Sequence, residues 1–195
     1  MPKTSPPTKA RLRDRFRRYR RTVSNAGWAQ RSDAIHQRVR ACPELRSAQT
    51  VHVYWPQTAN REVDTRPLID ALVAHGTTVV LPVVAAYPPE APALVHRRYA
   101  GRDALTPNRW GIPEPTGTPI VDPAALDVVL VPALGAGRNG HRIGHGAGYY
   151  DAFLAKIDAP AIALVYDATL VPAVPAEPHD QPVDAIATET TLVRP

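Results

Sequence analysis

Between Lys9 and Val23, apolar residues recur every three or four positions, which predicts an amphipathic helix. Its apolar stripe consists of Leu12, Phe16, Tyr19 and Val23. A second helix is predicted from Trp28 to Cys42. Its expected buried positions are Ala34, Ile35, Val39 and Cys42. The N-terminal region is therefore expected to be helical.

Short apolar runs replace this spacing after residue 50. They are VHVYW (51–55), TTVVLPVV (77–84), DVVLVPAL (127–134) and AIALVY (161–166). Such runs are typical of strands that are buried on both faces of a parallel sheet. Two helical patterns lie between these runs. The first extends from Thr65, the expected N-cap, to Gly76, where the helix is expected to end, and the second extends from Tyr149 to Ile157. In the first of these helices the expected inward-facing residues are Leu68, Leu72 and Val73.

The alternation of strands and helices predicts one α/β domain over residues 1–195, a three-layer α/β/α sandwich around a mostly parallel sheet with N-terminal helices. Residues 1–8 are expected to form a flexible tail. In open α/β sheets, ligands bind beyond the carboxyl ends of the strands. Three loops then share that edge: residues 56–64, the glycine-rich segment after the third strand, and the loop 171–182. We therefore expect one composite site.

Composition indicates the class of protein. The chain is 44% hydrophobic and 21% charged, as soluble globular proteins are. Its 22 prolines, many of them in 86–93 and 171–182, indicate rigid surface connections. The single cysteine, Cys42, excludes an internal disulfide and a cysteine-based zinc site. No apolar run approaches the roughly 18 residues of a membrane span, and no secretory signal is recognisable. We expect a soluble, cytoplasmic monomer without a membrane partner.

The net charge of +5 is unevenly distributed. Residues 1–40 carry twelve Lys/Arg against two Asp/Glu, which implies an anionic partner for this segment. One interpretation is a helix that binds nucleic acid. However, Phe16 and Tyr19 lie on the apolar stripe, and arginine outnumbers lysine twenty to three in the whole chain. Nucleic acid is therefore not the expected partner.

The segment GHRIGHGAGYYDAFL (140–154) carries the clearest chemical pattern. A glycine-rich loop that leads into a helix offers backbone N–H groups that suit phosphate. Arg142 adds positive potential, and Asp151 is a candidate ligand for Mg²⁺, which takes one or two carboxylates together with phosphate oxygens and water. The spacing matches neither the P-loop nor GxGxxG. The alternative is a plain turn in which the glycines serve tight packing.

Five segments in order resemble the 5-formyltetrahydrofolate cyclo-ligase family, also called 5,10-methenyltetrahydrofolate synthetase. They are KARLR (9–13), REVDT (61–65), WGIPEP (110–115), LVPALGAGRNGHRIGHGAGYYDAFL (130–154) and EPHDQPVDAIATE (177–189). The resemblance covers nearly the whole chain. It implies an ATP- and Mg²⁺-dependent ring closure of 5-formyltetrahydrofolate to 5,10-methenyltetrahydrofolate, with release of ADP and phosphate. ATP is then a co-substrate, and a reduced folate is the second small-molecule partner.

The resemblance also implies roles for individual residues. The residues expected to bind ATP are Lys9, Arg13, Arg142, Ile143, Gly144, His145, Gly146, Ala147, Gly148, Tyr149 and Tyr150. Those expected to bind the folate are Gln57, Glu62, Trp110, His145, Gly146, Ala147, Gly148 and Tyr149. Asp151 and Asp180 are the expected metal ligands, and Arg142, Tyr149 and Asp151 the expected catalytic residues. For Trp110, a half-buried core position is an equal alternative.

One departure from the family pattern lies at Ala136-Gly137, where the family has Phe-Asp. If that aspartate assists phosphate or metal binding, activity is reduced or the substrate is changed. A paralogue that binds nucleotide or folate without cyclising it is therefore one alternative function. A sugar-phosphate enzyme on a similar scaffold is another. The presence of Glu62, Asp151 and Asp180 together argues against both.

Overall fold

The computed structural model describes residues 7–86 and 91–195. The α-helices are α1 (Lys9–Thr22), α2 (Asn25–Arg40), α3 (Pro43–Ser47), α4 (Arg66–Ala74) and α5 (Tyr149–Leu154). The strands are β1 (Thr50–His52), β2 (Thr78–Ala86), β3 (Ala93–Arg98), β4 (Leu105–Pro107), β5 (Pro113–Pro115), β6 (Val128–Pro132), β7 (Gly135–Gly137), β8 (Arg142–Ile143), β9 (Ala161–Leu164), β10 (Leu170–Val171), β11 (Ala185–Ala187) and β12 (Leu192–Val193). The predicted tail 1–8 and the proline-rich stretch 86–93 lie partly outside the described residues.

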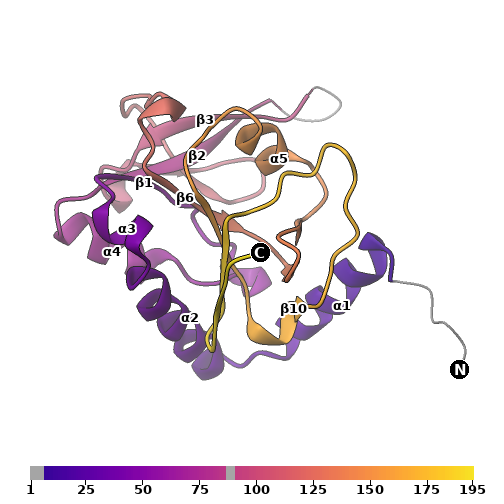
Figure 1. The fold of residues 1–195 in the computed structure, drawn as a ribbon. Coiled ribbons are helices and arrows are strands. Elements are labelled where there is room, and N and C mark those ends of the chain that lie inside the picture. Colours follow the sequence, from indigo (N-terminus) through magenta and orange to yellow (C-terminus); the bar gives the residue numbers. More distant parts are fainter. Residues whose placement is uncertain (1–6, 87–90) are drawn as a thin grey trace, which may run out of the picture.

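A seven-stranded sheet in the order β12-β11-β9-β6-β1-β2-β3 forms the centre of the fold (Figure 1). Strands β11, β9, β6, β1 and β2 pair in parallel, whereas β12 and β3 pair antiparallel at the two edges. The predicted mostly parallel sheet is therefore confirmed. The strands are continuous apolar runs because successive residues of a strand point to opposite faces of the sheet, and both of these faces are covered.

Helices cover both faces of this sheet. Ile35 of α2 and Leu68 of α4 share one buried cluster with Val128 and Leu130 of β6. On the opposite face, Phe153 of α5 shares a second cluster with the intervening strand residues, such as Val129 and Val131. In Figure 1, α2, α3 and α4 lie on the side of the sheet away from α5.

Helix α1 packs elsewhere. Its stripe residues Leu12 and Phe16 are buried with Leu134, Ile143 and Val171, which belong to or adjoin a small second sheet in the order β10-β7-β8. This sheet carries the start of the glycine-rich segment, because β8 consists of Arg142–Ile143. Helix α1 therefore supports the glycine loop with its first two turns, while Tyr19 packs against the core of the main sheet.

Several local predictions need correction. Val73 is 46% exposed rather than inward-facing. Ala34 and Tyr19 are only half-buried. Helix α2 begins at Asn25 because Ser24 caps it, its hydroxyl accepting a hydrogen bond from the Gly27 N–H at 3.1 Å. Thr65 precedes α4, but its hydroxyl donates to the Tyr54 carbonyl at 2.6 Å instead of capping the helix.

The predicted third strand, 127–134, ends at Pro132. The chain then turns into β7, which pairs with β8 and β10 and not with the main sheet. The edge strand β3 was not predicted, because its sequence ALVHRR has neither a continuous apolar run nor clean alternation. No helix within the described residues is long and apolar enough to cross a membrane.

Candidate active site

A cavity of about 650 Å³ lies beyond the carboxyl ends of β1, β2 and β6. The expected site residues that line it are Lys9, Arg13, Gln57, Glu62, Trp110, Arg142, Gly144, His145, Gly146, Ala147, Gly148, Tyr149, Tyr150, Asp151 and Asp180. Ile143 does not line the cavity, since its side chain is buried beside α1. The three predicted loops therefore meet at one place, as the parallel sheet requires.

The glycine loop, Gly144–Gly148, forms one wall of this cavity and leads into α5. Gly146 and Gly148 have φ values of +109° and +76°, a backbone region that disfavours side chains. Arg13 of α1 lies against the loop and donates from Nε to the Gly144 carbonyl at 3.1 Å. The loop is thus anchored by a cationic side chain that also lines the cavity.

Arg142 and Asp151 form an ion pair across the start of α5. Arg142 Nη2 lies 3.0 Å from Asp151 Oδ1, and Nη1 donates to the Gln181 carbonyl at 2.5 Å. Asp151 Oδ1 also accepts the Gln181 N–H at 3.1 Å. Burial lowers the pKa of Arg142, and the charge of Asp151 opposes this shift. The pair connects the glycine loop to the 177–181 turn.

Lys9 connects α1 to the same turn. Its Nζ lies 2.5 Å from Asp180 Oδ2 and 3.3 Å from Glu177 Oε2. Partial burial lowers the pKa of Lys9, but the two carboxylates outweigh it and leave the pKa raised. Burial likewise raises the pKa of Asp180, but the Lys9 and Glu177 N–H hydrogen bonds outweigh it and leave the pKa lowered. We refer to Lys9, Arg142, Asp151, Glu177 and Asp180 as the ion-pair end of the cavity.

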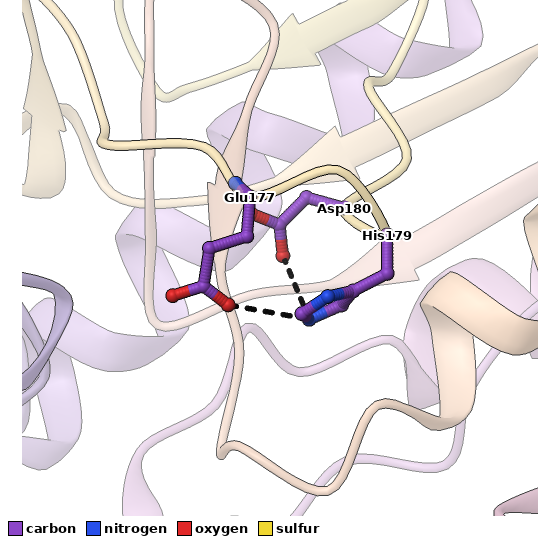
Figure 2. A group of neighbouring side chains, drawn as sticks. All are labelled: Glu177, His179 and Asp180. Atoms are coloured by element: carbon purple, nitrogen blue, oxygen red, sulfur yellow. Dashed lines mark hydrogen bonds and ion pairs between the residues drawn. The ribbon is translucent and has the colours of Figure 1, made fainter.

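Figure 2 shows Glu177, His179 and Asp180 converging from this turn. His179 Nε2 lies 3.4 Å from Glu177 Oε2 and 3.8 Å from Asp180 Oδ1, and potential ligand atoms of the three side chains lie within 4.8 Å of one another. Carboxylate oxygens suit Mg²⁺, whereas imidazole does not. The site therefore fits an ion held by Asp180 and Glu177. Asp151 is not part of this trio and adjoins it through the Gln181 N–H.

Glu62 lies at the other end of the cavity and is only 3% exposed. Its Oε2 accepts the Gln57 N–H at 2.9 Å, and its Oε1 lies 3.8 Å from His145 Nε2 and 3.9 Å from Arg20 Nη1. Burial raises the pKa of Glu62, but the His145 contact, the Arg20 charge and the Gln57 N–H act against it and leave the pKa lowered. We refer to Arg20, Gln57 and Glu62 as the Glu62 end.

Hydrogen bonds from the core hold the loop that carries Glu62. Trp28 Nε1 donates to the Glu62 carbonyl at 2.7 Å, the Tyr54 hydroxyl to the Val63 carbonyl at 3.2 Å, and the Tyr166 hydroxyl to the Arg61 carbonyl at 2.9 Å. Arg61 adopts a φ of +48°, the one positive value of a non-glycine residue in the described parts of the chain. The carboxylate is therefore held on a preorganised loop.

Sequence reasoning missed much of the wall between the two ends. It comprises Tyr54, Trp55, Pro82, Val84, Leu94, Asn108, Ile112, Pro113, Glu114 and Pro132, with Glu177 and His179 at the ion-pair end. Most of these residues belong to β2, β3 and the β4–β5 hairpin, whose approach to the cavity has no local signal. Trp110 is 50% exposed, so it is not a core residue, and its ring lies edge-on to Tyr149 with centroids 6.5 Å apart.

The departure at Gly137 lies away from the cavity. A Cβ at this position would be 2.2 Å from Asn139 Oδ1 and 2.5 Å from the Val174 nitrogen. Asn139 Oδ1 accepts the Val174 N–H, and its Nδ2 donates to the Val174 carbonyl, both at 3.1 Å. Asn139 therefore occupies the space that a side chain at position 137 would need, and that space faces the 171–174 loop rather than the site.

The sequence matches the model of the 5-formyltetrahydrofolate cyclo-ligase family over residues 6–189. It is 33% identical over 180 residues to a 5-formyltetrahydrofolate cyclo-ligase of Mycolicibacterium smegmatis, covering 90% of this chain and 91% of that one. It is 31% identical over 160 residues to the Escherichia coli K12 protein of that name, covering 80% and 86%. The NMR structure of Aquifex aeolicus 5,10-methenyltetrahydrofolate synthetase superposes with a TM-score of 0.83 at 26% identity, covering 95% of this chain and 92% of that chain.

Proposed function

The chain belongs to the 5-formyltetrahydrofolate cyclo-ligase family and is an enzyme of that class, and from this premise we propose how it works. We propose that it closes 5-formyltetrahydrofolate to 5,10-methenyltetrahydrofolate, using ATP with Mg²⁺ and releasing ADP and phosphate. The observation that carries this proposal is the cavity with two chemically different ends. One end offers ion-paired side chains whose charges suit phosphate and metal, and the other offers a buried carboxylate beside aromatic and aliphatic side chains.

The pterin ring is proposed to bind at the Glu62 end. Glu62 lines the cavity, and its Oε1 is proposed to accept ring N–H donors, while Oε2 is already bonded to the Gln57 N–H. Gln57 thus contributes its backbone N–H, since its side-chain Oε1 accepts from Asn60. Tyr54, Trp55 and Val84 supply apolar surface for the ring. The partly exposed Trp110 is proposed to cover the ligand from the solvent side.

The triphosphate is proposed to bind at the ion-pair end, where Lys9, Arg13 and Arg142 supply positive charge and the glycine loop supplies backbone N–H groups. Asp180 and Glu177, with Asp151 adjoining, are the residues that would hold Mg²⁺, which would neutralise charge on the phosphates. Lys9 is bonded to Asp180 and Glu177. On ligand binding, Mg²⁺ would take the place of Lys9 at these carboxylates, and a phosphate would become the partner of Lys9.

The proposed chemistry requires positioning more than covalent work from the protein. The formyl oxygen of the folate attacks the γ-phosphoryl group of ATP, with ADP as the leaving group. N10 of the folate then attacks the same formyl carbon and forms the new C–N bond, and loss of the N10 proton and cleavage of the bond from that carbon to the phosphate oxygen give the methenyl product and phosphate. Arg142 and Asp151 are proposed to hold the glycine loop against the reacting phosphoryl group. Tyr149, whose hydroxyl donates to the Ala86 carbonyl at 3.0 Å, is proposed to position the folate.

A direct assay tests the proposal. The purified chain is mixed with 5-formyltetrahydrofolate, ATP and Mg²⁺, and the near-ultraviolet absorbance of the methenyl product is followed. We expect a rise that requires ATP and that Asp151→Asn abolishes, while the matched surface variant Asp158→Asn keeps full activity. Bound ATP without turnover would favour the non-cyclising paralogue. No turnover and no nucleotide binding would exclude the proposed reaction. The enzyme is proposed to act as a monomer, because the proposed phosphate, metal and pterin contacts are all assigned to residues of this chain.

A further inference from the structure

Arg20 differs from the other arginines of α1. Its side chain is buried, with 2% of the residue exposed, whereas Arg11, Arg15, Arg18 and Arg21 are exposed. Its Nη2 donates to the Ala133 carbonyl at 2.5 Å. Within the described residues, its Nε and Nη1 are buried without a hydrogen-bond partner. An ionised group that is buried in this way needs a compensating charge.

That charge is Glu62, whose Oε1 lies 3.9 Å from Arg20 Nη1. Two basic side chains face this carboxylate, Arg20 from α1 and His145 from the glycine loop. The phenols of Tyr54 and Tyr150 also interact with it electrostatically, and burial holds the pKa of both phenols above its ordinary value, so they stay neutral. His145 carries a charge only when it is protonated, whereas an arginine remains charged at every pH of interest.

Arg20 does not line the cavity, and it reaches a charged side chain that does through its ion pair with Glu62. We infer that Arg20 is the positioning residue of the folate site, which keeps Glu62 ionised and directs its Oε1 toward the pterin ring. This inference rests on the proposed function of Glu62 as the pterin-binding carboxylate. Without Arg20, burial would favour the protonated acid, which has one acceptor fewer to offer to ring N–H donors.

The test compares Arg20→Gln with Arg20→Lys and with the matched control Arg21→Gln, an exposed arginine on the same helix. Steady-state KM values for 5-formyltetrahydrofolate and ATP are measured between pH 6 and 9. For Arg20→Gln we expect a rise in the folate KM of roughly tenfold or more at neutral pH, with the ATP KM within about twofold. Arg20→Lys retains the charge and should restore most of the folate affinity.

The pH profile separates this role from a merely structural one. In Arg20→Gln, the folate KM should fall again toward the wild-type value as the pH rises, because alkaline pH ionises Glu62 without its partner. The wild-type and Arg21→Gln profiles should lack this recovery. Equal increases in both KM values, or a folate KM that does not change with pH in Arg20→Gln, would overturn the inference.

A second measurement covers the case in which Arg20→Gln does not fold. Removing one partner of a buried pair leaves the other uncompensated. The double variant Arg20→Gln/Glu62→Gln, which removes both charges, should therefore unfold at a higher temperature than either single variant. A double variant that remains unfolded would overturn the inference, since Arg20 would then act independently of Glu62.

Failure of this inference is distinguishable from failure of the proposed function. If Glu62→Gln leaves the folate KM unchanged, the pterin role of Glu62 is wrong and the inference is overturned with it. If Glu62→Gln weakens folate binding but Arg20→Gln does not, Glu62 keeps its proposed role and only the inference about Arg20 is overturned.

Discussion

The two ends of the cavity carry charged groups in opposite ways. At the ion-pair end, Lys9 bonds to two carboxylates, and Asp180 and Glu177 belong to a turn that is partly open to solvent. At the Glu62 end, one carboxylate and one guanidinium are almost completely buried, and hydrogen bonds from Trp28, Tyr54 and Tyr166 hold the loop. The first arrangement can exchange partners, but the second cannot without loss of buried hydrogen bonds.

This difference corresponds to the two ligands we propose. A metal-bound triphosphate brings its own charges, so side chains that neutralise one another in its absence can rearrange around it. A pterin ring is neutral and flat, so its binding depends on an acceptor that is already in place. Preorganisation lowers the free-energy cost of binding at the Glu62 end. The ion-pair end instead adapts to its ligand.

The substitution with the largest expected effect is Glu62→Gln. The amide retains the shape of the side chain but loses the charge and one acceptor, so we expect kcat/KM for 5-formyltetrahydrofolate to fall roughly 100-fold. ATP binding, measured by calorimetry, should change by less than about twofold. Glu44→Gln, which removes a surface partner of Arg194, is the matched control and should retain activity. A parallel loss of ATP affinity would show that the two ends are not independent.

Asp180→Asn tests the opposite end. Because Asp180 is a proposed metal ligand, the Mg²⁺ concentration for half-maximal activity should rise about tenfold. The folate KM of this variant should stay unchanged. In the wild-type site the pKa of Asp180 is lowered, so this carboxylate becomes protonated only in acid, as the pH falls through that pKa. Unchanged Mg²⁺ dependence would exclude Asp180 as a ligand and favour Asp151 or Glu177.

The ion-pair end was more predictable from the sequence than the Glu62 end. Lys9, Arg13 and the glycine loop follow from local spacing and from the resemblance. The cavity wall from β2 and β3 depends on antiparallel pairing at an edge, which leaves no local pattern. Arg20 was missed, although it lies four residues after Phe16 and so falls on the buried stripe of α1. An arginine at a stripe position is the signal that could have identified it.

Substitutions of Gly137 and Asn139, at the base of the glycine loop, should have a smaller effect, on stability rather than on activity. Gly137→Asp should destabilise the fold by about 1–3 kcal/mol, because the Cβ position lies 2.5 Å from the Val174 nitrogen. Asn139→Ala should also destabilise it, by removing two hydrogen bonds to Val174. In the double variant the new carboxylate can accept the Val174 N–H, so denaturant unfolding should show a loss smaller than the sum of the single losses. Altered KM values would contradict our placement of position 137 outside the site.

A buried histidine pair under α5 gives a pH effect that is independent of both ends. The rings of His52 and His96 meet edge to face, with centroids 5.1 Å apart. Burial lowers the pKa of His96 to about 4 and that of His52 well below its ordinary value. The unfolded chain thus binds more protons below pH 6.5 or so, and stability falls as the pH drops, by up to about 1.4 kcal/mol per pH unit for each histidine. His96→Phe should flatten this dependence in urea unfolding between pH 4 and pH 6.5, whereas His75→Gln on the surface should not.

The smallest effect is expected on the exposed face of α1. Arg11, Arg15, Arg18 and Arg21 are exposed, whereas Lys9 and Arg13 line the cavity and Arg20 is buried beside Glu62. Replacing the four exposed arginines by glutamine removes half of the eight cationic side chains of α1 without changing either end. The KM values for ATP and 5-formyltetrahydrofolate should therefore stay within about twofold at physiological salt, where exposed charges are screened. A salt-dependent affinity for single-stranded DNA that is lost in this variant would support a nucleic-acid role for the helix. If activity fell with the four exposed arginines and not with Lys9, the division of α1 into a solvated face and a catalytic face would be wrong.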